Sequence, residues 1–295
     1  MKQIKSYCLG LVLASMTLLI TSCCSGGSSA LVASPNPNVA VTASYKVEYL
    51  PVAPANPTMG KTTFQLRITN LSDGTPATGK AVSLAPMMHM PSMDHSTPVD
   101  VVTESSTPGT YDCTVYYIMA SSDVDHWELD VIIAGETATF SPTVSMPMGS
   151  DSVRATLYGP DDIVSGMSGT QYNKYYLLKD GSVTVAASTL GLFIAHGENM
   201  NMKFVPVSDG SVLSSPTGTV TAMTVQASMD SSFSSPLTAV DNGAGHWSVS
   251  GLTGLVSAQT TTIYVKLSVN TQDKTTNGLA ASGSNGYATF IVTPQ

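Results

Sequence analysis

Short segments in which apolar and polar residues alternate, separated by turn residues, most strongly constrain how this chain can fold. In residues 62–70 the apolar Phe64, Leu66 and Ile68 alternate with polar residues. A β-strand points successive side chains to opposite faces, so such a segment has one face for a core and one for solvent. Similar segments recur along the chain, and long amphipathic helical patterns do not. The sequence therefore predicts an all-β fold.

Two groups of such segments predict two β-sandwich domains. The first domain is expected over 39–147, with strands at 40–50, 62–70, 79–88, 99–105, 110–119, 126–134 and 136–146. Seven short strands in about 110 residues are typical of an immunoglobulin-like sandwich. The second domain is expected over 153–295, with later strands at 190–196, 201–207, 217–228, 245–250, 260–270 and 286–293. The turn residues 179–182 predict a hairpin at its start.

Composition narrows the class of protein. Charged residues make up 11% of the chain, the apolar fraction is 42% and the net charge is −8. No run of basic residues is present, which argues against a nucleic-acid partner. No nucleophile–base pair is visible, so an enzyme is not expected, and the adjacent acids Asp161 and Asp162 are expected to be solvated. An extracytoplasmic protein fits this composition best.

The N-terminus has the pattern of a secretory signal. A short cationic start precedes an apolar run of 13 residues at 8–20, whereas about 20 apolar residues are needed to span a bilayer. The residues Ile20-Thr21-Ser22-Cys23 resemble the lipobox of bacterial lipoproteins. We therefore expect residues 1–22 to be a lipoprotein signal peptide and Cys23 to be lipidated. A plain signal peptide cleaved nearby is the alternative.

A tether is expected to follow the lipidated cysteine. Residues 23–38 are rich in Ser, Gly and Pro and have no apolar period. A lipid on Cys23 would anchor the protein to a membrane. The next residues are Cys24 and Ser25 rather than an Asp, which resembles sorting to the outer membrane. We expect a location in the cell envelope and leave open which face of the membrane the protein occupies.

A segment rich in methionine and histidine suggests a metal site. Residues 87–95 read Met-Met-His-Met-Pro-Ser-Met-Asp-His. Thioether sulfur is a soft ligand and imidazole is borderline, a combination that suits copper, above all Cu(I). Calcium and magnesium would require more oxygen ligands, and zinc sites favour Cys, His and carboxylate.

The period of a strand indicates which of these side chains could converge. If 79–90 is extended, Met87 and His89 share one face and Met88 and Met90 the other, and Pro91 ends the strand. The expected copper ligands are Met90, Met93 and His95, with His126 as a candidate fourth ligand, His89 as a further candidate and Asp94 as a hydrogen-bond acceptor for an imidazole. The alternative is that these methionines fill gaps in a core or contact other proteins.

A second, weaker cluster echoes the first. Each of the two tryptophans follows a histidine, at His126-Trp127 and His246-Trp247, and two related sandwiches that each bury one Trp would explain this. The second candidate metal site consists of His196, Met200, Met202 and His246. Ordinary core methionines are the alternative there. Cys113 is expected to be a small core residue, with a thiolate copper ligand as the alternative.

Residues 59–145 resemble the YtkA-like domain, an immunoglobulin-like bacterial domain related to FixH. The resemblance rests on Gly109-Thr110-Tyr111, on Trp127-Glu128-Leu129 and above all on Met90-Pro91-Ser92-Met93-Asp94-His95. It covers about a third of the chain and does not extend to 153–295. It implies copper handling in the cell envelope, with Met90, Met93 and His95 as ligands. His126 departs from the pattern, because this family more often has Gly or Lys before the Trp.

Two functions from different classes are compatible with the sequence. The first is a lipid-anchored envelope protein that binds copper, for buffering or for delivery to another copper-handling envelope protein. The second is a structural or adhesive surface module without a metal. The Met/His segment distinguishes the two functions, because a structural surface module would not require it.

Overall fold

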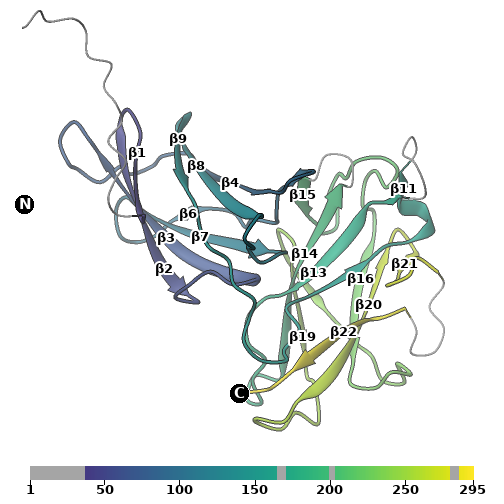
Figure 1. The fold of residues 1–295 in the computed structure, drawn as a ribbon. Coiled ribbons are helices and arrows are strands. Elements are labelled where there is room, and N and C mark those ends of the chain that lie inside the picture. Colours follow the sequence, from purple (N-terminus) through teal and green to yellow (C-terminus); the bar gives the residue numbers. More distant parts are fainter. Residues whose placement is uncertain (1–36, 165–170, 199–202, 280–285) are drawn as a thin grey trace, which may run out of the picture. The chain divides into compact units, whose positions relative to one another are not determined.

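The computed structural model describes residues 37–164, 171–198, 203–279 and 286–295, all of which belong to one compact unit. Apart from one turn of 3-10 helix at Pro160–Asp162, the regular structure in these ranges consists of β-strands (Figure 1). This confirms the predicted all-β fold class. Within the same ranges, no helix is long and apolar enough to cross a membrane. The predicted signal, Cys23 and most of the predicted tether lie outside the described residues.

The N-terminal half contains two antiparallel sheets, drawn in purple, blue and teal in Figure 1. The first has the order β1-β2-β3-β7-β6 and the second β5-β4-β8-β9. The strands of the first sheet are β1 (Val39–Val41), β2 (Tyr45–Ala53), β3 (Gly60–Asn70), β6 (Thr103–Glu104) and β7 (Thr110–Tyr117), and those of the second are β4 (Val82–His89), β5 (Asp94–His95), β8 (His126–Ile133) and β9 (Glu136–Phe140).

One hydrophobic core joins these two sheets. Phe64 and Leu66 of β3 and Trp127 and Leu129 of β8 are buried in the same cluster. The alternate residues of these strands face outward, so the two sheets form a sandwich with one apolar layer between them.

The C-terminal half repeats this plan. Its larger sheet has the order β10-β13-β14-β19-β18, with β15 also paired to β14, and its second sheet has the order β17-β16-β20-β21, with β22 paired to β20. The strands of these two sheets are β10 (Arg154–Leu157), β13 (Lys174–Lys179), β14 (Thr189–Glu198), β15 (Lys203–Pro206), β16 (Met223–Ser228), β17 (Leu237–Thr238), β18 (Val240–Gly243), β19 (His246–Ser250), β20 (Thr261–Val269), β21 (Gln272–Lys274) and β22 (Ala288–Val292). Strands β11 (Ile163–Val164) and β12 (Gln171–Tyr172) form a separate two-stranded sheet. A second core, which includes Trp247, lies between these sheets.

The predicted hairpin at 179–182 is wrong in its length. Strands β13 and β14 do pair, with Lys179 opposite Leu192, but residues 180–188 form the connection. The segment that follows the turn is bonded to the C-terminus instead, because Val185 donates to the carbonyl of Gln295 and Gln295 donates to the carbonyl of Val183. The pairing with the far end of the chain therefore overrides the local turn signal.

The expectation that Asp161 and Asp162 are solvated is also wrong for Asp162. This side chain is fully buried, and its carboxylate accepts a hydrogen bond from the buried Lys274 Nζ at 3.0 Å and another from the Gly159 amide at 2.7 Å. Asp161 accepts from the same ammonium group at 2.7 Å. Burial raises the pKa of Asp162. A lysine 112 residues away in sequence could not be assigned as its partner from the local pattern.

A third apolar cluster connects the two halves. It joins Tyr116 and Ile118 of the N-terminal half to Leu178, Phe193 and Ala195 of the C-terminal half. The rings of Tyr116 and Phe193 stack with their centroids 4.3 Å apart and their planes 8° from parallel. Such stacking adds to the stabilisation from the buried area.

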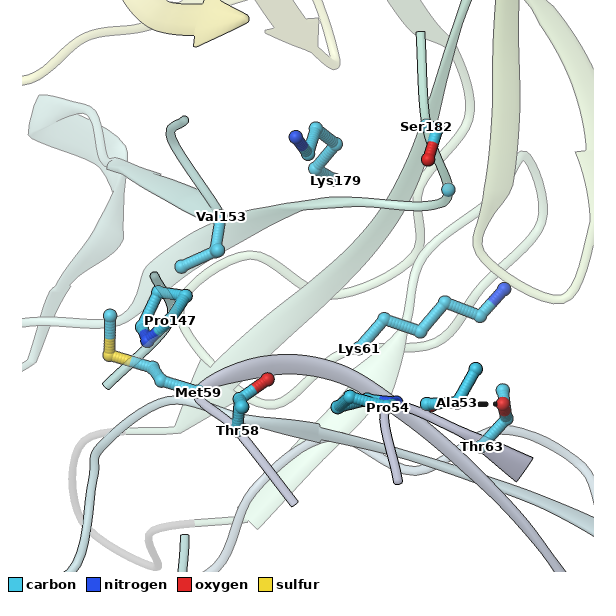
Figure 2. Close-up of a pocket in the computed structure, with 11 residues that line it drawn as sticks. Ala53, Pro54, Thr58, Met59, Lys61, Thr63, Pro147, Val153, Lys179 and Ser182 are labelled. Atoms are coloured by element: carbon cyan, nitrogen blue, oxygen red, sulfur yellow. Dashed lines mark hydrogen bonds between the residues drawn. The ribbon is translucent and has the colours of Figure 1, made fainter. Parts of the chain in front are cut away.

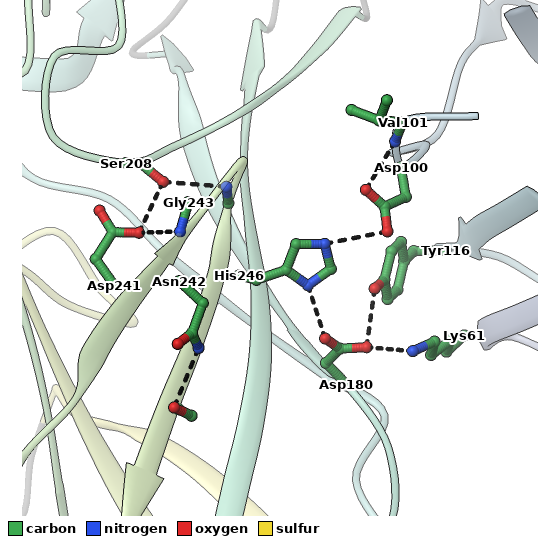
Figure 3. A network of polar contacts seen from close by, with 12 residues as sticks. Lys61, Asp100, Val101, Tyr116, Asp180, Ser208, Asp241, Asn242, Gly243 and His246 are labelled. Carbon is green, nitrogen blue, oxygen red and sulfur yellow. Dashed lines mark hydrogen bonds and ion pairs between the residues drawn. The ribbon is translucent and has the colours of Figure 1, made fainter. Parts of the chain in front are cut away.

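Polar contacts surround this cluster (Figure 3). His246 lies between two carboxylates, with Nδ1 2.8 Å from Asp180 and Nε2 3.0 Å from Asp100 of the other half. Asp180 also accepts from Lys61 Nζ at 2.5 Å and from the Tyr116 hydroxyl at 3.0 Å. Burial lowers the pKa of His246, but the hydrogen bonds to Asp180 and Asp100 outweigh burial and raise that pKa above its usual value. His246 is therefore a charged link between the halves at mildly acidic pH.

Candidate metal centre

The Met/His segment folds into one corner of the sheet β5-β4-β8-β9. Strand β4 ends at His89, immediately before Met90 and Pro91, and the short strand β5 returns beside it. The amide of Met90 donates to the carbonyl of Met93 at 3.2 Å, which closes the connection between the two strands. Pro91 has no N–H group for a ladder, which explains why β4 ends here.

The register of these strands produces two rows of side chains. Met88 lies opposite His95 on one side and opposite Trp127 on the other. His89 lies in the same way between Asp94 and His126. Neighbours in a register share a face of the sheet and consecutive residues do not. We call His95–Met88–Trp127 the inner row, because all three are buried, and Asp94–His89–His126 the outer row, because it faces solvent.

His95 has one close neighbour at each ring nitrogen. Only 2% of the residue is exposed, and Nδ1 lies 2.7 Å from the carbonyl oxygen of Ser96. Nε2 lies 3.2 Å from the sulfur of Met119. The ring meets Trp127 edge to face, with the centroids 5.5 Å apart. Trp127 in turn donates its Nε1–H to the carbonyl of Met119 at 3.0 Å, which fixes the backbone of that methionine.

These contacts assign the tautomer of His95. A neutral imidazole carries one N–H group, and a carbonyl oxygen can only accept a hydrogen bond. The 2.7 Å contact with Ser96 therefore places the proton on Nδ1. Nε2 then directs a lone pair at the thioether sulfur, which has lone pairs of its own and no proton. In this tautomer, two soft or borderline donor atoms face each other in a buried site.

The outer row has a different chemistry. His89 Nδ1 lies 3.2 Å from an oxygen of Asp94, and His89 Nε2 lies 3.9 Å from an oxygen of Glu128. The rings of His89 and His126 have their centroids 5.2 Å apart. These side chains are partly or largely exposed. The donors on this face are nitrogen and oxygen, without sulfur.

The predicted ligand set is divided between these faces. His95 lies inside and His126 and His89 lie outside, so His95 and His126 cannot serve one site across the sheet. Met90 is half-buried against the core, whereas half of Met93 is exposed. The predicted alternation of Met87, Met88 and His89 is confirmed, since Met88 is buried and its two neighbours are not.

Met119 is the candidate ligand that the sequence did not reveal. It follows strand β7, 24 residues after His95, and no local spacing connects the two. The only signal was a methionine at the end of the predicted strand 110–119, directly before the loop that leads to Trp127. Long-range pairing of strands brings it beside the imidazole.

The structure does not bring His196 and His246 together. Phe193 pairs with His246 across the strands, and His196 lies on the opposite face of β14, inside the second core. His246 instead contacts Asp100 and Asp180. Met200 and Met202 lie outside the described residues, so a site made of His196 with these methionines stays a prediction.

Cys113 is a weaker candidate ligand. Cys113 is buried, and burial together with the nearby Asp112 raises the pKa of its thiol, which favours the predicted core role over a thiolate ligand. Among the described residues, no group of three or more His, Cys, Asp or Glu side chains converges around one point. That absence concerns His, Cys, Asp and Glu alone, so it does not cover the contact between His95 and the thioether of Met119.

A groove of about 430 Å³ is lined by residues of both halves (Figure 2). Its two lysines already have carboxylate partners, Lys61 with Asp180 and Lys179 with Asp151 at 2.7 Å. Burial raises the pKa of Asp151, but the hydrogen bonds from Lys179 and Thr293 together with the charge of Lys179 outweigh burial and lower that pKa. The groove therefore offers a bound anion little positive charge that is not already neutralised.

Comparison with known proteins does not assign a family. No protein-family model matches the chain, and no curated protein matches it.

Proposed function

We propose that this protein binds copper in the cell envelope, as a lipid-anchored protein that buffers Cu(I) or delivers it to another copper-handling envelope protein. The observation that carries the proposal is the 3.2 Å contact between His95 Nε2 and Met119 Sδ. Imidazole nitrogen and thioether sulfur are ligands of Cu(I), and the lone pairs that face each other here would both be satisfied by one ion. His95 and Met119 would hold the ion, and both would supply it with neutral ligands.

The surroundings of the pair suit a soft monovalent ion. Met88 lies beside His95 in the inner row, and the half-buried Met90 directly follows the end of β4. Two further methionines therefore lie in this corner of the sheet. The edge-to-face contact of Trp127 with His95 limits the access of water on that side. Neutral ligands exchange Cu(I) without a proton cost, which suits transfer to a partner.

The anchor is part of the same proposal. It depends on the lipobox-like residues 20–23 and on a lipid at Cys23, which would keep the copper site near a membrane. The YtkA-like pattern of residues 59–145 supports the same location.

The proposal is tested by Cu(I) affinity, measured in competition with a chromophoric chelator. Accessible thiols are alkylated first, because Cys24, and Cys23 in any chain without the lipid, would otherwise bind Cu(I) themselves. Met119→Leu keeps the size and apolar character of the side chain but removes the sulfur. We expect tight binding of one equivalent and an affinity at least ten-fold lower in this variant. Met148→Leu is the control, because Met148 is 99% exposed. Equal affinities in all three proteins would contradict the proposal.

A structural or adhesive surface module is the second candidate. The stacked Tyr116 and Phe193 and the carboxylates around His246 join the two halves, which is what a stiff spacer needs. On this account the native chain would bind no Cu(I) after alkylation, and the inner row would be ordinary core.

A further inference from the structure

The outer row, together with Glu128, has the arrangement of a second metal site. His126 and Glu128 are two residues apart on β8, so their side chains leave the same face of the sheet. His89 on β4 is directly opposite His126 in the register. Two neighbouring strands thus present two imidazoles and one carboxylate to one patch of surface, and the backbone ladder fixes their spacing.

Asp94 orients one of these imidazoles. Its carboxylate lies 3.2 Å from His89 Nδ1 and accepts a hydrogen bond from the N–H group at that nitrogen. The other nitrogen, Nε2, then carries a lone pair and lies 3.9 Å from Glu128 Oε1. This distance is too long for a hydrogen bond. A carboxylate that holds one nitrogen while the other is free to bind an ion is the usual partner of a metal-binding histidine.

We infer that His89, His126 and Glu128 bind a divalent ion of the Zn(II) and Cu(II) class, with Asp94 as the residue that positions His89. Imidazole and carboxylate donors suit these ions, in contrast to the nitrogen and sulfur donors of His95 and Met119. The two carboxylates also supply negative charge to offset that of the ion.

Closure of this site would require rotation of its side chains. Among the described residues, His89, His126 and Glu128 do not converge around one point as they stand. The side chains of His89 and Glu128 are 34% and 43% exposed, and His126 is exposed, so their rotamers can change without repacking the core. The site is therefore open at the surface and would keep water on the ion. It is independent of the proposed Cu(I) site, because the sheet separates the two sets of donors.

The test is a Zn(II) titration of the full chain against a chromophoric indicator, with accessible thiols alkylated. We expect one equivalent to bind, with the affinity at least ten-fold lower in His126→Gln and in Glu128→Gln. Asp130→Asn is the matched control, because Asp130 lies on the same face of β8, two residues further on, and contacts Thr139 instead. Asp94→Asn should weaken binding by a smaller factor, since Asp94 acts through His89.

Two further readouts separate this site from the Cu(I) site. Zn(II) should shift the ring resonances of His89 and His126 and leave those of His95 in place, and Met119→Leu should leave the affinity for Zn(II) unchanged. Absence of Zn(II) binding, or equal affinity in the native chain, His126→Gln and Glu128→Gln, would overturn the inference whatever the outcome of the Cu(I) experiment.

Discussion

The two His-Trp dipeptides occupy matching positions in the two halves and differ in what surrounds them. In both, the Trp is buried and its Nε1–H donates to a backbone carbonyl, that of Met119 for Trp127 and that of Val207 for Trp247. His126 remains exposed beside His89, whereas His246 is enclosed by the carboxylates of Asp100 and Asp180. The same dipeptide thus gives the same anchor for the Trp, while the neighbouring strands decide the role of the His.

The buried histidines of the two halves differ in the same way. His95 has a hydrogen-bond acceptor at one nitrogen and a sulfur at the other. His196 is fully buried, and neither of its nitrogens has a hydrogen-bond partner among the described residues. Burial lowers the pKa of His196 to about 4. One interior histidine therefore has a polar contact at each ring nitrogen, and the other is a core residue that packs beside the ring of Tyr175.

Replacement of either Trp should cause the largest change in stability. Trp127→Ala and Trp247→Ala should each lower the free energy of unfolding by about 3–5 kcal/mol, because each removes a large ring from a closed core. Denaturant titration followed by circular dichroism measures both. If either variant lost less than about 1 kcal/mol, the two anchors would not be equivalent.

Replacement of His196 should change the free energy of unfolding in the opposite direction. His196→Leu should raise the free energy of unfolding by about 1–2 kcal/mol, since it replaces buried, unbonded nitrogens with apolar surface. The same denaturant titration measures the change. Cu(I) stoichiometry is measured beside it, because a lost equivalent would restore the predicted site of His196, Met200 and Met202.

The pH dependence should separate His196 from His246. The pKa of His196 is about 4 in the folded chain and 6.5 as the reference value, so the unfolded chain takes up this proton first as the pH falls. Stability is therefore lost between about pH 6.5 and 4, and His196→Leu should reduce that loss. The pKa of His246 is raised, so its contribution is complete below its reference value of 6.5 and is lost as the pH rises through the folded-state pKa.

The control for this pH experiment is His246→Gln. Unfolding midpoints between pH 4 and 8 should show a reduced loss of stability on the alkaline side in this variant. If both His196→Leu and His246→Gln reduced the loss of stability on the same side of the pH range, the distinction between a neutral core histidine and a charged link would be contradicted.

Asp100→Asn tests the contact between Asp100 and His246, and its expected effect is the smallest of this series. The side chains of Asp100 and His246 are about a quarter exposed, so solvent screens their attraction. The free energy of unfolding should fall by about 0.5–1 kcal/mol. Asp112→Asn, which changes a carboxylate on β7 bonded to Gln65, serves as the control. An equal loss in both variants would mean that the contact with His246 contributes nothing specific.

The sequence predicted the features that depend on neighbouring residues. The alternation of Phe64, Leu66 and Ile68, the end of β4 before Pro91 and the burial of both Trp follow from strand period and residue type. Register between strands is set by contacts distant in sequence. For this reason the pattern could not reveal that Met119 meets His95 or that His89 and His126 share a face.

The most direct test of the Cu(I) site is X-ray absorption at the copper edge of the chain loaded with one equivalent of Cu(I) after thiol alkylation. Nitrogen and sulfur neighbours are both expected around copper, and the sulfur contribution should decrease in Met119→Leu and persist in Met148→Leu. A spectrum with nitrogen and oxygen neighbours alone, or an identical spectrum in Met119→Leu, would contradict the assignment of His95 and Met119 as the copper ligands.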